Sequence, residues 1–147
     1  ALSSRLDGSD MALRFAAALV GPHDAHDITT NAFLRVTRQE NWASFEHLDR
    51  YLYRAVRNEA ANLWRQRHRR WERDLAAVAA SIVTDTVTDV DVVRSIAGLS
   101  LQQRCVVYFT YWHQMTEAEI ADALGISRGT VHRNLHRAQT HLREALT

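Results

Sequence analysis

The chain has 147 residues, of which 46% are apolar and 24% charged, so it can bury a core but is too short for a large enzyme. Its formal net charge is only +1, and its 18 strongly basic residues are all Arg, which contacts phosphates and base edges bidentately. A GC-rich genome would produce the same bias, and we favour that explanation for the absence of Lys. The sequence lacks a membrane-spanning apolar run and a signal-peptide pattern over residues 1–21, and the lone Cys105 fits a reducing, cytoplasmic compartment. Because the first residue is Ala1 and not Met, we expect native sequence to precede it.

The small net charge conceals blocks of opposite sign. The net charge is −3 over residues 1–49, +6 over 50–73, −4 over 74–93 and +2 over 94–147. A basic block supplies the sequence-independent part of nucleic-acid affinity. A solvated helix face would have the same composition, so the block at 50–73 leaves both interpretations open.

The first predicted helix ends near Val20. Ser9 or Asp10 can cap its start. Gly21 and Pro22 end it, because Gly tolerates left-handed backbone and Pro cannot continue the hydrogen-bond ladder.

A second helix is predicted over about 24–38, then a loop over 39–47 and a long helix from Leu48 to beyond Arg70. Apolar residues recur along the long helix with a period near 3.6, which predicts a buried face. They are Leu48, Tyr51, Leu52, Ala55, Val56 and Leu63. The opposite face carries Arg50, Arg54, Arg57 and His68.

Residues 81–92 are β-branched and acidic and alternate as a strand would. Because no second strand is available to pair with them, we interpret them as an extended linker. A short helix over about 89–97 overlaps its end and stops at Gly98, and Ser100 can cap a helix over 101–112.

The C-terminal segment has the spacing of a helix-turn-helix. Thr116 and Glu119 form a capping box for a helix over 117–124, Gly125 permits a tight turn, and Ser127 caps a last helix over about 128–145. The predicted inward residues are Ile120, Ala121 and Leu124, then Val131, Leu135, Ala138 and Leu142.

The opposite face of the last helix is polar and cationic. In a helix-turn-helix the second helix enters the major groove, where Arg pairs with guanine and Asn134 or His132 can read other base edges. Ser127 and the helix N-terminus can hold a phosphate. A plain helical hairpin with a solvated face is the alternative.

These motifs resemble those of bacterial sigma-70-family factors, most closely the small extracytoplasmic-function (ECF) group. The resemblance is carried in the C-terminal half by Glu119-Ile120-Ala121, by Leu124-Gly125-Ile126-Ser127-Arg128-Gly129-Thr130-Val131, by Leu135-His136-Arg137-Ala138, and by Leu99 to Arg104. In the N-terminal half, residues 24–36 look like the family's polymerase-binding helix, and residues 51–58 and 65–70 look like its −10 helix. The match covers roughly residues 12–73 and 92–147.

The resemblance implies an all-α fold of two small helical domains joined by a flexible linker. Residues 1–75 would form a region 2-like domain, 76–91 the linker, and 92–147 a region 4-like helix-turn-helix domain. It also implies a promoter-specificity subunit that is not an enzyme and needs no cofactor or metal. Its partners would be core RNA polymerase (the β′ clamp helices and the β flap), promoter DNA and an anti-sigma factor.

The resemblance also implies three sets of site residues. Those for the −35 element are Ser127, Arg128, Thr130, His132, Arg133, Asn134 and Arg137. Those for the melted −10 element are Trp42, Ser44, Phe45, Arg54, Arg57, Asn58, Asn62 and Arg65. Those for core polymerase are Asp24, Asp27, Ile28, Thr30 and Asn31.

The −10 assignment makes physical sense, because single-stranded DNA is held by a positive track with aromatic surfaces for unstacked bases. Trp64 and Trp71 lie among the arginines of the basic block. Core packing is the alternative role for each aromatic residue, and we favour it for Tyr51 and Phe33.

Several positions depart from the family pattern. The family usually has Glu at His26, Gln-Glu at Thr30-Asn31, Trp at Tyr51 and often Asp at Asn62. Residues 1–11 match the family's first helix poorly. Because the positions of His26, Thr30 and Asn31 help hold polymerase in the family, we expect polymerase affinity or its pH dependence to differ.

The sequence supports other functions less well than it supports a sigma factor. A sigma mimic that sequesters an anti-sigma factor would not need the Arg face of the last helix, and a stand-alone dimeric repressor would need a dimer helix. A recombinase would need a catalytic cluster, which is missing. His132 and His136 have metal-chelating spacing without further ligands, and Cys105 lies in an apolar run typical of a core.

Overall fold

The computed structural model describes the backbone of residues 2–83 and 98–145 and the side chains of residues 10–67 and 98–145. Its helices are α1 (Leu2–Val20), α2 (Pro22–Thr37), the 3-10 turn η1 (Trp42–Ser44), α3 (Leu48–Val83), α5 (Leu101–Tyr111), α6 (Glu117–Leu124) and α7 (Arg128–Ala145). The described part contains no strand, which confirms the predicted all-α fold. The helix predicted over 89–97 lies outside the described residues.

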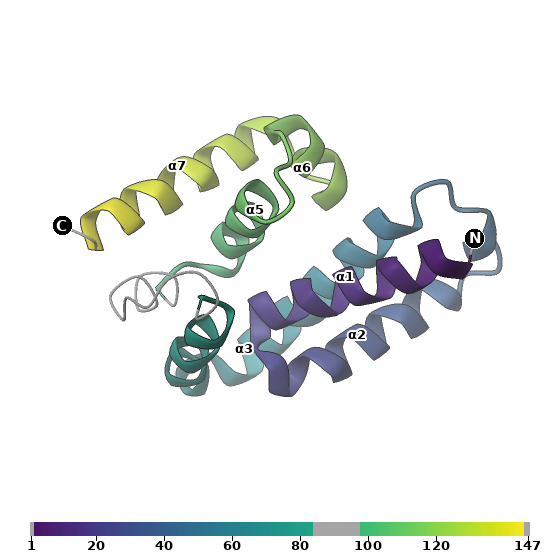
Figure 1. The fold of residues 1–147 in the computed structure, drawn as a ribbon, viewed down its shortest axis with the longest axis horizontal. Helices are drawn as coiled ribbons and strands as arrows, with labels where there is room; N and C mark the ends of the chain where they lie inside the picture. The colour runs from purple at the N-terminus through teal and green to yellow at the C-terminus, as the bar shows by residue number, and fades with distance from the viewer. Residues whose placement is uncertain (1, 84–97, 146–147) are drawn as a thin grey trace.

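The N-terminal domain is a three-helix bundle of α1, α2 and α3 (Figure 1). The predicted start of α1 at Ser9 or Asp10 is wrong, because the helix already begins at Leu2. Asp10 pairs instead with Arg14 one turn later, an interaction of the interior of a helix and not of a cap. At its other end α1 stops as predicted, with Gly21 at a φ of 97°.

The long helix α3 extends to Val83, beyond the predicted start of the linker at residue 76. It changes direction at Arg67, whose backbone is non-helical (Figure 1). The predicted apolar stripe is correct at Leu52 but wrong at Tyr51, which is 42% exposed. Tyr53 is buried instead, because a second domain packs on this side of α3.

The C-terminal domain consists of α5, α6 and α7, and its caps agree with the sequence. Thr116 and Glu119 make the predicted reciprocal capping box at the start of α6, and Ser100 caps α5. Gly125 ends α6 in the left-handed region at a φ of 67°, which allows the tight turn into α7. The Ser127 hydroxyl oxygen accepts from the Thr130 N–H at 3.1 Å, which caps the start of α7.

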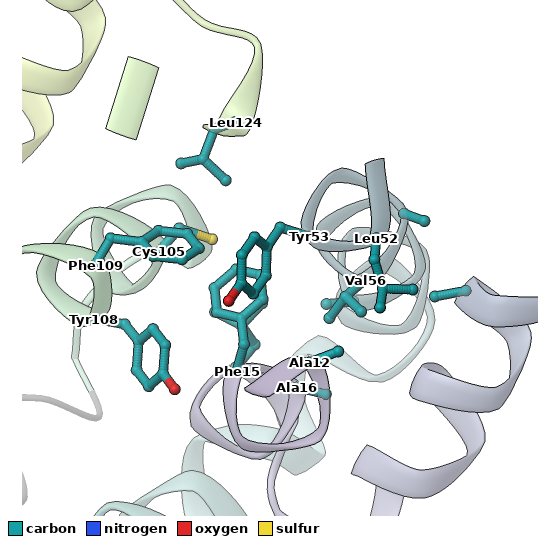
Figure 2. Packing of buried hydrophobic residues seen from close by; sticks show 14 of the residues in the cluster. Ala12, Phe15, Ala16, Leu52, Tyr53, Val56, Cys105, Tyr108, Phe109 and Leu124 are labelled. Atoms are coloured by element: carbon teal, nitrogen blue, oxygen red, sulfur yellow. The ribbon is translucent and has the colours of Figure 1, made fainter. Parts of the chain in front are cut away.

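The two domains share one apolar core. Phe15 of α1 lies 4.8 Å from Phe109 of α5 and 5.5 Å from Tyr53 of α3, measured between ring centroids. Figure 2 shows these rings interleaved between the helices, beside Tyr108 and Cys105. The chain therefore folds into two helical domains, and the apolar surfaces that face each other are buried in a single core.

Candidate nucleic-acid interface

The recognition helix α7 presents its polar face to solvent. Val131 and Ala138 are buried against α5 and α6, while His132, Arg133 and Arg137 are exposed. This arrangement follows from the 3.6 period of the helix, which puts the apolar and cationic residues on opposite sides. The face can therefore enter a DNA major groove without disturbing the core.

The N-terminal turn of α7 is pre-organised by its own hydroxyl groups. Ser127 Oγ lies 2.8 Å from Thr130 Oγ1, and Arg133 Nη2 donates to the same Thr130 oxygen at 3.2 Å. Asn134 Nδ2 donates to the Thr130 carbonyl at 2.9 Å, so its amide is engaged within the helix. Arg128 is exposed at the first position of the helix.

His132 joins the two helices of the helix-turn-helix. Its Nδ1 lies 3.0 Å from Glu117 Oε1 at the start of α6. This carboxylate can orient the exposed imidazole ring, whose other nitrogen, Nε2, is then a group for a base edge or a phosphate. The structure brings all seven predicted −35 residues onto α7 and the turn before it.

The predicted −10 loop forms η1 and the residues beside it. Trp42 is half-buried against the core, and Ser44 Oγ donates to the Asn41 carbonyl at 2.7 Å. Phe45 stacks on Tyr51 with centroids 4.4 Å apart. The exposed ring of Tyr51 therefore extends an aromatic surface that begins in the loop, a role that its assignment to the core had missed.

The predicted −10 residues of α3 divide into two groups. Asn58, Asn62 and Arg65 are exposed, and Arg65 donates to the Asn62 side chain. The guanidinium groups of Arg54 and Arg57 instead donate to backbone carbonyls at the end of α6 in the other domain. This contact could not be predicted from the sequence, because the partners lie 67 to 69 residues apart.

Arg50 is a further member of this contact. Its guanidinium forms an ion pair with Asp122 of α6, a residue that the sequence did not single out.

The five residues predicted to bind polymerase lie on α2, but on two different sides. Asp27, Thr30 and Asn31 are exposed. Ile28 is only 4% exposed and packs in the bundle core, so the structure contradicts its assignment to a binding surface. Asp24 is half-buried and pairs with Arg67 at 3.1 Å, close to the change of direction in α3.

Trp64 has a structural role at the domain interface. Its Nε1 donates to the Leu19 carbonyl at 3.1 Å, and the guanidinium of Arg104 lies 5.4 Å from its ring. Burial lowers the pKa of Arg104 to about 10, which still leaves it charged at neutral pH. The side chain of Trp71 lies outside the described residues.

Cys105 is a core residue, as its apolar surroundings predict. Its side chain is fully buried, and burial raises the pKa of the thiol to about 12. A protonated, inaccessible thiol is a poor nucleophile. Among the described residues no group of three or more His, Cys, Asp or Glu side chains could hold a metal ion, and no described helix is long and apolar enough to span a membrane.

The fold and the face of α7 together define a two-domain, all-helical protein with a helix-turn-helix. Residues 89–142 match the family described as sigma-70, region 4. The chain is 36% identical to an RNA polymerase sigma-E factor of Streptomyces avermitilis over 142 residues, covering 93% of this chain and 79% of that protein. It is 35% identical over 146 residues to the sigma-E factor of Streptomyces coelicolor, covering 93% and 80%.

A solved structure has the same fold. It is the sigma factor RpoE of Bartonella quintana in complex with the anti-sigma factor NepR, with a TM-score of 0.69 at 19% identity over 98% of this chain and 94% of that one. On the strength of the sequence relatives, this chain belongs to the sigma-70 family of RNA polymerase sigma factors, in the ECF group.

Proposed function

We propose that this sigma factor binds core RNA polymerase and directs initiation at promoters, reading the −35 duplex through α7 and holding the melted −10 strand through the η1 loop and α3. The observation that carries the proposal is the exposed cationic face of α7, on a helix-turn-helix in which α6 is capped at both ends and α7 at its start. Arg133 and Arg137 project from this face at positions i and i+4, a spacing that suits adjacent base edges.

The surface for polymerase would be one face of α2. Asp27, Thr30, Asn31 and Leu34 follow the i, i+3, i+4, i+7 spacing of a single helix face, and Leu34 is 48% exposed. An exposed Leu surrounded by polar residues is typical of a protein-binding surface. We include Leu34 in the proposed site in place of Ile28, and we propose the β′ clamp helices as its partner and the β flap as the partner of the C-terminal domain.

We also propose an anti-sigma factor as a partner, supported by the complex in which the Bartonella protein was solved. As a subunit of the transcription machinery the protein would act in the cytoplasm, without catalytic chemistry of its own. A sigma mimic remains the second candidate, but the exposed cationic face of α7 disfavours it, because a mimic need not bind DNA.

The test begins with run-off transcription by core polymerase and this protein on a genomic DNA library, which supplies a promoter. On that promoter, Arg133→Ala or Arg137→Ala should weaken −35 binding by about 1–3 kcal/mol if the contact is a bidentate base contact. Arg143→Ala is the matched control, because it removes the same charge from the last turn of α7. Absence of promoter-selective initiation would favour the mimic. Equal losses of −35 binding in all three variants would overturn the base-reading assignment.

The polymerase surface is tested separately with Asp27→Arg and Leu34→Ala. Both should reduce the amount of protein retained by immobilised core polymerase, while the helical circular dichroism stays unchanged. Asp10→Arg, an exposed charge reversal on α1 instead of α2, is the control. Undiminished retention of both variants would move the polymerase contact to another surface.

A further inference from the structure

A carboxylate of α6 contacts an imidazole ring on the recognition helix α7. His132 Nδ1 lies 3.0 Å from Glu117 Oε1, and the side chain of His132 is 69% exposed while that of Glu117 is 36% exposed. An exposed pair of this kind contributes little to folding stability. Its effect is therefore to be sought in the orientation of the ring and in which nitrogen atom carries the proton.

Glu117 is held in place by the start of α6. Thr116 and Glu119 close the capping box around it, through two hydrogen bonds of 3.2 Å. Glu117 itself lies in the first turn of the helix, where the helix dipole favours a negative side chain. This anchored turn therefore presents a hydrogen-bond acceptor to a ring that lies 15 residues further along the chain.

The contact determines which ring nitrogen of His132 donates. An ionised carboxylate only accepts hydrogen bonds, so Nδ1 must carry a hydrogen atom for the two groups to bond. In the neutral imidazole the other nitrogen, Nε2, then has no hydrogen atom and is an acceptor. In the imidazolium both nitrogens donate, so Nδ1 keeps its bond to Glu117 and Nε2 becomes a donor. Protonation therefore reverses the hydrogen-bonding role of Nε2 alone.

The bases of a DNA duplex distinguish these two roles of Nε2. In the major groove, adenine N6 and cytosine N4 carry amino groups that an acceptor can bind, whereas guanine offers the acceptors O6 and N7, and thymine the acceptor O4. Arg133 and Arg137, on the same helix, can only donate. A neutral His132 therefore adds to this face an acceptor that arginine cannot supply.

We propose that Glu117 is a positioning residue for DNA recognition, which keeps the hydrogen atom of neutral His132 on Nδ1 so that Nε2 selects an adenine or a cytosine at one position of the −35 duplex. This inference rests on the proposed function, since it takes α7 as the helix that reads the duplex. As the pH falls through the range in which histidine takes up a proton, Nε2 becomes a donor, and the preference at this position moves towards guanine or thymine.

His132 also has other charged and titratable groups around it. Those on its own helix, within one turn, are Arg128, Arg133 and His136. The helix α5 also packs on α7, and its Tyr111 hydroxyl accepts from Gln139, about two turns further along α7. Of these groups, Glu117 hydrogen-bonds the ring, so we attribute the pH dependence to this pair and test it by changing each member.

The test is a selection of binding sites from a library of random-sequence DNA duplexes, by the full chain alone and bound to core RNA polymerase. Glu117→Gln keeps the shape of the side chain but can donate to Nδ1, which releases the tautomer, and His132→Ala removes the ring. Asp122→Asn is the matched control, because it neutralises a carboxylate of the same helix that pairs with Arg50. Each selection is made at about pH 8 and at about pH 5.5, on either side of the titration of histidine.

At the higher pH we expect the wild type to enrich adenine or cytosine at one position, and His132→Ala to lose the preference at that position alone. Glu117→Gln should weaken this preference about two- to tenfold, the range of one hydrogen bond, and should admit guanine. At the lower pH the wild-type preference should move towards guanine or thymine, while His132→Ala should select the same bases there at both pH values. Asp122→Asn should behave as the wild type.

A double variant shows whether Glu117 acts through the ring. Glu117→Gln combined with His132→Ala should bind the selected duplex as His132→Ala does, because the carboxylate then has no imidazole to orient. An equal effect of Glu117→Gln with and without His132 would mean that only the charge of Glu117 matters, and would overturn the proposal. Circular dichroism checks that each variant is folded.

Other results would also overturn the proposal. If His132→Ala changes no position of the selected site, the ring reads no base. If the wild type selects guanine or thymine at this position at the higher pH, Nε2 is a donor and the tautomer is the opposite one. A wild-type preference retained by Glu117→Gln at both pH values would show that the carboxylate does not set the tautomer. Failure of the wild type to enrich any sequence, alone or with polymerase, would instead refute the proposed function itself.

Discussion

Gly125 connects the first helix of the helix-turn-helix to the recognition helix, and its backbone lies in the left-handed region at a φ of 67°. A side chain there would be strained by about 1–2 kcal/mol and would also press on Arg54. The left-handed backbone of Gly125 and the close approach of Arg54 therefore both depend on the absence of a side chain at this residue.

We expect Gly125→Ala to lower the free energy of unfolding by about 1–2 kcal/mol or more, measured by urea denaturation. Gly129→Ala is the matched control, because Gly129 is helical and its Cβ would meet the flexible end of Arg133 at 3.4 Å and Ser127 Oγ at 3.9 Å, without a close contact. The control should be neutral or stabilising by up to about 1 kcal/mol, since Ala is the better helix former. Equal losses in both variants would contradict this account.

His113 lies among the aromatic rings of the shared core. Its ring centroid is 5.3 Å from that of Tyr108, 5.7 Å from Phe109 and 6.2 Å from Tyr53. Burial lowers the pKa of His113 below its ordinary value of 6.5 and raises the pKa of Tyr53 to about 12. The rings facing the imidazole are therefore uncharged at neutral pH, and none of them compensates an imidazolium.

The sign of the pH effect follows from this lowered pKa. The unfolded chain takes up a proton at His113 near pH 6.5, while the folded protein resists it until a lower pH, so acidification favours unfolding below about 6.5. We expect the melting temperature to fall more steeply between about pH 7.5 and 5.5 in the wild type than in His113→Gln. His141→Gln, at an exposed position, should retain the wild-type slope. An identical slope in His113→Gln would exclude this residue as the source.

At the scale of elements, α6 is a helix of eight residues that depends on its ends. Its N-terminus is closed by the reciprocal bonds between Thr116 and Glu119, both of 3.2 Å. Its C-terminus is closed by Gly125 and by arginines of another domain. A helix this short is unstable in isolation, so its caps and its packing decide whether it forms.

Thr116→Ala should therefore lower the free energy of unfolding by about 0.5–2 kcal/mol, because the Glu119 N–H loses its acceptor. The value is obtained from chemical denaturation. Thr116→Ser keeps the hydroxyl group and should stay close to the wild type. A serine variant as unstable as the alanine variant would mean that the methyl group, and not the cap, is what matters.

Most elements of this chain were predictable from local signals. Caps and turns such as Ser100, Thr116, Gly125 and Ser127 act over three or four residues, and the structure confirms them. The start of α1 was not predictable from such signals, because Ser and Asp can cap a helix and can also lie within it as an i, i+4 partner. The extension of α3 to Val83 is a second element that the β-branched, acidic composition did not indicate.

At the scale of the whole molecule, the shared core couples the two domains. Phe15 is fully buried and contacts rings from both α3 and α5. Removing it would leave a cavity whose walls belong to both domains. The free energy of unfolding therefore depends on the packing of the two domains against each other.

We expect Phe15→Ala to lower the free energy of unfolding by about 3–5 kcal/mol. Hydrogen exchange should show lost protection in α5 as well as in α1 and α3. Phe33→Ala, at a half-buried position of α2, is the control and should cost less, with its effect confined to the N-terminal bundle. Lost protection limited to α1–α3 in Phe15→Ala would mean that the domains are not coupled.

The sequence alone determined the helical class, the helix-turn-helix and the membership of a sigma-factor family, because each depends on short-range spacing of apolar, capping and glycine residues. It also identified the cationic face of α7, since a regular helix converts spacing directly into a face. Only the tertiary structure decided that Ile28 is buried, that Tyr51 is exposed and Tyr53 is not, and that Arg54 and Arg57 contact α6. These outcomes depend on which surfaces of distant segments pack together, and the period of a single helix carries no information about its neighbours.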